Sequence, residues 1–257
     1  MQNARILFVA LIGLAITGQK AFALPDELEV HLDDITKTGE FALDTITSYT
    51  VSGPRTAADN GLRPTRHLIQ VSPDISYGFS KNSQFDLQLF SSVALSGETR
   101  IDGARVEALT IPIRPEDEDD DGLFLGGLFE VGHLPATLST NNLDAEIKLI
   151  LGYRLGRWVF ATNPEIGFKV SGSGSGASPD LSTKVKIAYR AGESYSIGIE
   201  QYSELGQLRQ IGPLNQQSQQ TFAVVDFKHG DKDFNIGVGR GWNDYSCLLY
   251  TSPSPRD

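Results

Sequence analysis

The sequence contains almost no sulfur, and what it has lies at its ends. Its one methionine is Met1 and its one cysteine is Cys247. No disulfide can therefore stabilise the fold, and packing and backbone pairing must do so. After the first 23 residues, no run of consecutive apolar residues is long enough to cross a bilayer as a helix. These absences exclude a disulfide scaffold and a helical membrane protein.

Positive charge is also scarce. Residues 24–246 contain 19 basic and 31 acidic side chains, which gives a formal net charge of −12. A protein that binds phosphate backbones needs a basic face, so nucleic acid is not expected as a partner.

The N-terminal residues 1–23 have the pattern of a secretory signal peptide. Arg5 provides a basic start, 6–16 form a short apolar stretch, and 21–23 fit the small-x-small cleavage rule. We therefore expect cleavage before Leu24 and export through the inner membrane. A retained membrane anchor is the alternative.

The C-terminal residues 247–257, CLLYTSPSPRD, match nothing upstream. They resemble the translation of an adapter used in transposase-based sequencing libraries. We predict that this tail is non-native and that the native chain continues differently after Ser246; a native disordered tail is the alternative. Amplification of the locus without such adapters should recover about fifteen to twenty other residues, the length of one loop and one spanning strand. A stop codon directly after Asp257 would contradict this.

Between these ends, apolar residues recur at every second position. In HLIQVSPDISYGF (67–79), the odd-numbered residues share one face and mostly polar residues the other, which is the period of a half-buried strand. Most such segments have about ten residues or more, the length that a tilted strand needs to cross a bilayer. The expected strands lie near 40–52, 66–79, 84–95, 102–114, 123–134, 142–154, 158–170, 181–190, 194–203, 219–228 and 233–242.

Eleven strands do not close a bacterial membrane barrel, which has an even number of strands and no unpaired edge in lipid. We therefore predict an all-β, transmembrane antiparallel barrel of twelve strands, with the last strand missing from this chain. Tight turns, such as 155–157, alternate with longer loops, such as 204–218. Short turns are periplasmic in such barrels. This assigns 24–39 to a periplasmic segment and 40–246 to the incomplete barrel.

Aromatic residues fall near strand ends on the expected lipid-facing register. Girdles of this kind mark membrane interfaces, although ordinary β-propensity also enriches aromatic residues in strands. The residues are Tyr77, Phe79, Phe85, Tyr153, Trp158, Tyr189, Tyr195 and Trp242.

Over 40–242 the chain resembles uncharacterised Gram-negative outer-membrane β-barrels of the porin and transporter-like kind. The resemblance is carried by the alternating pattern, by YGFSKNSQFDLQLF (77–90) and by WVFATNPEIGF (158–168). It implies a location in the cell outer membrane, with lipid around the barrel and no catalytic residues. The final aromatic-ended strand that is usual in such barrels is not present.

Other patterns indicate neither a metal nor a cofactor. The acidic turn 116–122 contains D-x-D-x-D-G, but position twelve of a calcium loop falls on Leu128, which favours a solvated turn over a calcium site. Residues 170–177 hold G-x-G-x-x-A, but a strand follows where a dinucleotide site needs a helix. The four histidines lack metal-ligand spacing, and no G-x-S-x-G occurs. A Ser–His pair formed only in space stays open.

The later strands alternate charged with apolar side chains. Charge on a lipid face costs a few kcal/mol near the midplane, so the charged face is expected to line the lumen, with Asn163 beside it. Acidic residues on one strand and basic residues on its neighbours predict cross-strand ion pairs, which either stiffen the interior or line a narrow pore. The candidate pore-lining residues are Asp144, Glu146, Lys148, Arg154, Glu165, Lys169, Lys184, Lys186, Arg190 and Glu200.

Three functions are compatible with these patterns. The first is passive passage of small polar or amphiphilic solutes, with Lys184 and Lys186 tuning ion preference. The second is a structural or surface-interaction barrel with a plugged lumen. The third is an outer-membrane lipid hydrolase. A soluble lipocalin-type barrel would need an apolar lumen, the reverse of the charge placement expected here.

Overall fold

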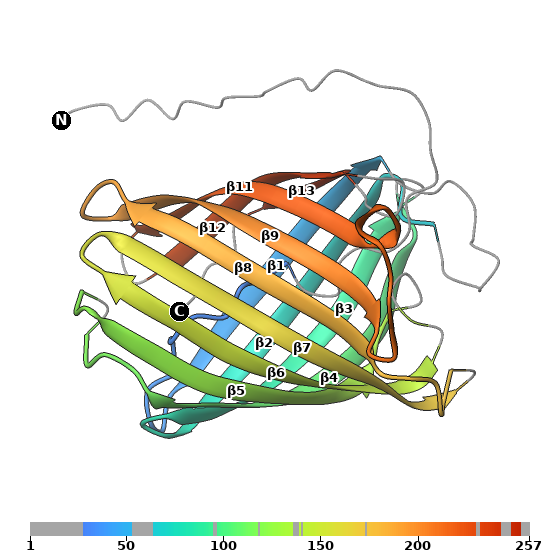
Figure 1. Ribbon diagram of the computed structural model, residues 1–257, viewed down its shortest axis with the longest axis horizontal. Helices are drawn as coiled ribbons and strands as arrows, with labels where there is room; N and C mark the ends of the chain where they lie inside the picture. The colour runs from blue at the N-terminus through green and yellow to red at the C-terminus, as the bar shows by residue number, and fades with distance from the viewer. Residues whose placement is uncertain are drawn as a thin grey trace.

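The computed structural model describes residues 28–52, 64–94, 97–117, 119–135, 139, 141–172, 174–229, 232–242 and 248–252. The expected signal peptide, most of the loop 53–65 and parts of the C-terminal tail lie outside these residues. The described strands form one antiparallel sheet that curls into a barrel (Figure 1). No helix in the described part of the chain is long and apolar enough to cross a membrane.

The alternating sequence forms the strands that were expected from it. Each of the eleven expected strands is present, with its ends within four residues of those expected. The long strands are β1 (Phe41–Ser52), β2 (Leu68–Ser80), β3 (Ser83–Ala94), β4 (Thr99–Ile113), β5 (Gly122–His133), β6 (Asn141–Leu155), β7 (Trp158–Gly172), β8 (Asp180–Arg190), β9 (Tyr195–Gln207), β11 (Ser218–His229) and β12 (Lys232–Gly241). Between β9 and β11 lie the short strand β10 (Gln210–Ile211) and the 3₁₀ turn η1 (Leu214–Gln216), and β13 (Leu248–Ser252) follows β12.

The twelfth position of the ring is filled by β13. This strand pairs with β1 from Thr47 to Ser52 and with β12 at Val238 alone, so twelve strands follow one another around the barrel. The number is the one expected, but we expected the last strand to be missing, and here five residues of the tail occupy its place. Without a twelfth strand, the facing edges of β1 and β12 would leave backbone N–H and C=O groups unpaired. An extended segment within reach can form hydrogen bonds with these groups.

The two faces of the sheet differ as a membrane barrel requires. On β6, Ile147 and Leu149 are about half exposed on the outside, whereas Lys148 between them is completely buried on the inside. The same alternation places Leu87 and Phe129 outside and Asp86 and Glu130 inside. This apolar exterior and charged interior are the reverse of a soluble barrel and are typical of an outer-membrane strand.

One end of the barrel carries paired aromatic rings on its outer surface. We call it the turn end, because it holds 81–82, 156–157 and 191–194 together with the acidic turn; the opposite loop end holds 174–179 and 208–217. Trp242 lies at the loop end. The paired rings are Phe41 with Tyr77, Phe79 with Phe85, and Trp158 with Tyr189, and their centroids lie 4.6–4.9 Å apart. Such a ring of aromatic side chains is expected at a membrane interface.

Candidate functional site: the barrel interior

The ten candidate residues all lie on the inward register of their strands. Six of them are buried: Lys148, Arg154, Glu165, Lys184, Lys186 and Glu200. The other four, Asp144, Glu146, Lys169 and Arg190, are of intermediate exposure. Their placement inside the barrel follows from the same alternation that exposes their apolar neighbours, while their role in lining a pore stays a prediction.

Lys148 is the centre of the first charge network. Its side chain is 0 % exposed, and its Nζ lies 3.5 Å from Glu165 Oε1, 3.6 Å from Glu146 Oε1 and 3.7 Å from Glu130 Oε2. The three carboxylates come from β7, β6 and β5, so one ammonium group joins three neighbouring strands. An ion pair removed from water to this degree has to be well compensated to be tolerated.

The network continues around the wall in both directions. Glu165 Oε1 lies 2.9 Å from Lys184 Nζ on β8. On the other side, Arg105 of β4 donates to Glu130 Oε1 and to Glu107 Oε1, both at 2.7 Å. Sequence reasoning missed Arg105 and Glu107, because 102–114 has the least regular alternation, and it did not place Glu130 of β5 in the lumen. The available signal was Arg105 and Glu107, two opposite charges two residues apart on one strand.

A second charge network surrounds Lys186. Its Nζ lies 2.8 Å from Asp226 Oδ1 and 3.0 Å from Glu200 Oε1. Tyr202 donates its hydroxyl to Glu200 Oε2 at 2.7 Å, and Asn235 donates its amide to Asp226 Oδ1 at 2.7 Å. The network thus ties together β8, β9, β11 and β12. Asp226 was not among the predicted residues.

The acidic turn lies at the turn end and is tied to its neighbours. Asp119 forms an ion pair with Arg190, and Asp121 Oδ1 accepts a hydrogen bond of 2.5 Å from the backbone N–H of Gly156. Among the described residues, no group of three or more His, Cys, Asp or Glu side chains is placed to hold a metal ion. Of the described carboxylates of this turn, Asp119 and Asp121 thus have partners on neighbouring turns or strands.

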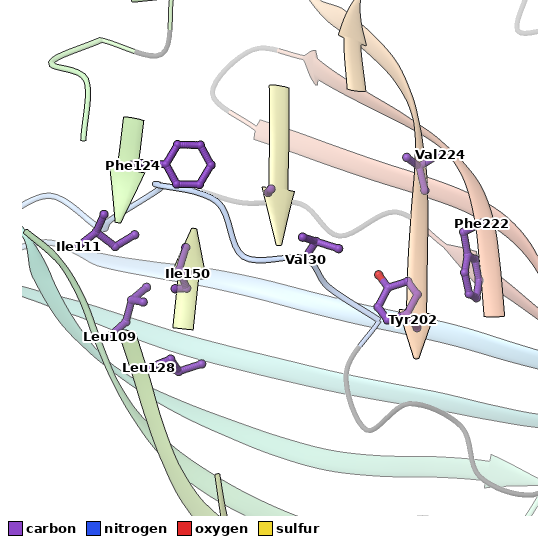
Figure 2. Close-up of a cluster of buried hydrophobic side chains, with 10 residues drawn as sticks. Val30, Leu109, Ile111, Phe124, Leu128, Ile150, Tyr202, Phe222 and Val224 are labelled. Carbon is purple, nitrogen blue, oxygen red and sulfur yellow. The ribbon is translucent and has the colours of Figure 1, made fainter. Parts of the chain in front are cut away.

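The described part of the segment 24–39 enters the lumen, which the assignment to the periplasm did not foresee. Figure 2 shows the chain at Val30 running among inward-facing apolar side chains of several strands. Val30 is 4 % exposed, and Leu28, Leu32 and Ile35 pack against the same cluster. The wall residues of the cluster include Leu109, Ile111, Phe124, Leu128, Ile150, Tyr202 and Phe222.

Polar contacts hold this interior segment, residues 28–39, to the wall. The amide of Asn163 accepts from the backbone N–H of His31 at 2.8 Å and donates to its carbonyl at 3.1 Å. Arg154 forms a buried ion pair with Asp33. The backbone N–H of Thr36 donates to Gln84 Oε1 at 2.7 Å. The segment is thus attached to β3, β6 and β7 by side chains of the wall.

The close approach of this segment to β2 requires a glycine. A Cβ at Gly78 would lie 2.2 Å from the carbonyl oxygen of Thr36 and 2.4 Å from that of Lys37. Both distances are far inside van der Waals contact, so any larger residue must displace the segment. Gly39 N donates to Gly78 O at 2.7 Å, immediately before β1 begins.

Two cavities lie inside the barrel, one towards each end. The larger, of about 690 Å³, is lined at the turn end by Glu193 and Ser194 and deeper in by Lys186, Glu200 and Asp226. The smaller, of about 270 Å³, lies towards the loop end and is lined by Glu130, Asp144, Glu146, Lys169 and Asp180 among others. Ten of the residues that line the larger cavity are acidic and four are basic. The cavity at the turn end is therefore a region of negative charge.

A belt of buried side chains separates the two cavities along β6 to β9. On each of these strands, residues of the larger cavity lie near the turn end and residues of the smaller one near the loop end. Between them, six inward-facing side chains line neither cavity and are at most 4 % exposed. This belt consists of Lys148, Ile150, Asn163, Glu165, Lys184 and Tyr202.

No protein-family model matches the chain, and no curated protein matches it. Solved structures do resemble it. The COG4313 outer membrane channel from Pseudomonas putida F1 has a TM-score of 0.59 at 12% identity, covering 90% of this chain and 98% of that one. The KdgM porin in complex with disordered oligogalacturonate has a TM-score of 0.55 at 13% identity, covering 84% and 98%. The KdgM porin alone has 0.54 at 10% identity with the same coverage.

These similarities concern the fold, because the identities are low. The neighbours are porins and an outer-membrane channel, so the chain has the fold of a porin-like outer-membrane β-barrel, as its sequence pattern implied. The location in the outer membrane stays a prediction from the sequence.

Proposed function

We propose that the protein is a narrow outer-membrane channel for the passive passage of small polar or amphiphilic solutes. The observation that carries this proposal is the pair of charge-lined cavities that reach from the two ends of the barrel towards one buried belt. A barrel that served only as a scaffold would need neither cavity. The fold of the porins and the channel described above supports the same function.

The charge of the larger cavity narrows the class of solute. One structural neighbour is a porin in complex with oligogalacturonate, a polyanion. Here the excess of acidic residues in the larger cavity disfavours such a ligand and favours cations or neutral molecules. Apolar side chains such as Leu28, Val30 and Leu32 line the same cavity, which accommodates an apolar part of the solute.

Single-channel recording in planar bilayers tests the proposal. In a gradient of potassium chloride we expect small conductance steps and a reversal potential that shows preference for cations. A twelve-stranded barrel lies between eight-stranded barrels filled by side chains and sixteen-stranded porins with wide pores, so the steps should be small. Slower gel migration after heating than before shows that the protein was folded. Folded protein without current above the lipid background would contradict a channel.

A plugged, structural barrel is the second candidate. The observation that favours it is the apolar cluster around Val30, which fills part of the lumen. For a lipid hydrolase the described contacts provide less support. The ring contacts that are described are His67 Nδ1 with Tyr49 Oη at 2.9 Å and His133 Nδ1 with the carbonyl of Asn142 at 3.1 Å, and neither partner is a serine.

A further inference from the structure

We infer that the interior segment, residues 28–39, is the internal gate of this channel and that its release joins the two cavities into one passage. This inference rests on the proposed function and names how the passage is regulated. Three observations carry it: where the segment lies, how it is attached and what remains of the barrel without it.

The segment lies where a gate is effective. Asn163 belongs to the buried belt, and both of its hydrogen bonds to the segment are made to the backbone of His31. The adjacent Val30 packs in one cluster with Ile150 and Tyr202, which also belong to the belt. Backbone and side chain of the segment thus fill the lumen at the level that separates the cavities.

The pairing of the barrel strands does not depend on the segment. Within the described residues, its only backbone ladder contact is the isolated bridge between Thr38 and Gly78. The hydrogen bonds that close the ring join the strands to one another and do not pass through the segment. The segment can therefore leave while the barrel stays intact, as a local unfolding step of low cost compared with global unfolding.

Two further features fit a gate: a glycine that acts as the hinge of the segment, and a buried ion pair, which we call the latch. Gly39 has a φ of 81° at the junction with β1, and a Cβ added there would meet no atom within 4 Å, so glycine and open space allow the backbone to turn at this point. The buried pair of Asp33 with Arg154 is the latch, reinforced by a hydrogen bond of 3.1 Å from Arg114 to the carbonyl of Asp33. Arg154 lies on β6 and Arg114 directly follows β4, so neither belongs to the segment and the latch breaks when the segment moves.

A reversible disulfide between the interior segment and the barrel wall tests the inference. The hydrogen bonds of 2.8 and 3.1 Å between the Asn163 side chain and the backbone of His31 place the two positions next to each other, and the test uses this proximity for a cysteine pair. The variant carries His31→Cys and Asn163→Cys, with Cys247→Ser to remove the one other thiol of this chain. We expect oxidised channels to stay closed and reduced ones to have an open probability about tenfold above wild type, in the range of allosteric couplings. Recording one channel before and after a reductant makes the protein its own folding control.

Two glycine-to-alanine variants, one as the test and one as its control, provide a second experiment that needs no cysteines. In Gly78→Ala the new methyl group collides with the carbonyl of Thr36, so we expect open probability to rise about tenfold. Gly127→Ala is the matched control, because a Cβ there meets only the carbonyl of Lys148 at an ordinary 3.7 Å. This control should behave as wild type.

The outcomes separate the gate from the channel. Channels that open on reduction and close on oxidation, together with an open Gly78→Ala variant, support the gate. Wild-type currents that neither Gly78→Ala nor the reduced pair alters overturn the gate and keep the channel. Folded barrels that remain silent in every variant overturn the channel itself, and with it the gate.

Discussion

Replacing Lys148 by methionine is expected to destabilise the barrel by about 3–5 kcal/mol, the usual cost of removing one partner from a buried ion pair. The ammonium group is 0 % exposed and lies within 3.7 Å of carboxylate oxygens of Glu130, Glu146 and Glu165. Without it, the mutual repulsion of these three carboxylates is less compensated. The free energy of unfolding is measured by urea titration of protein folded into lipid vesicles, with the fluorescence of Trp158 and Trp242 as the signal.

Lys169→Met is the matched control for this prediction. Its side chain is 30% exposed, and its ion pair with Asp180, 47% exposed, spans 2.8 Å. Exposed pairs of this kind contribute about 0–1 kcal/mol, so the loss should be several times smaller. In the double variant Lys148→Met with Glu146→Gln, removal of one carboxylate should recover part of the lost stability, which a double-mutant cycle measures. Equal losses in the two single variants would contradict the network described above.

Replacing Lys186 by methionine is expected to raise the preference of the channel for cations over anions about fivefold. Lys186 lines the larger cavity, where ten acidic residues already outnumber four basic ones. Removal of one unit charge changes the energy of an ion at about 4 Å by about 1 kcal/mol in water, which corresponds to that factor. The reversal potential in a salt gradient is the measurement, recorded in the Gly78→Ala background so that the channels are open.

Lys184→Met tests whether the larger cavity or the buried belt determines the ion preference of the channel. Lys184 is also buried and also paired with a carboxylate, Glu165 at 2.9 Å, but it lines neither of the two cavities. We expect a smaller shift in reversal potential from this variant. A larger shift than that of Lys186→Met would place the selective region in the belt instead. Methionine is preferred to glutamate, because a carboxylate at position 186 would lie beside Glu200 and Asp226.

The local pattern of the sequence determines the strands and their two faces. A side chain on a strand faces one side or the other with a period of two, so the alternation by itself assigns Lys148, Glu165 and Lys184 to the interior. Consecutive strands joined by short connections pair with each other, so ion pairs between β6, β7 and β8 could also be expected. Both inferences depend only on residues close together in the chain.

Three features depend on contacts between distant parts of the chain. The network of Arg105 requires the register of β4 against β5, which the pattern of 102–114 does not specify. The pairing of β13 with β1 joins residues some two hundred positions apart. The interior segment alternates Leu28, Val30 and Leu32 with polar residues, a pattern too short to distinguish a strand from a chain that packs its apolar side against the lumen. The tertiary structure alone decided these, because a closed ring creates an interior that must be filled, and which segment fills it depends on the shape and charge of all its strands together.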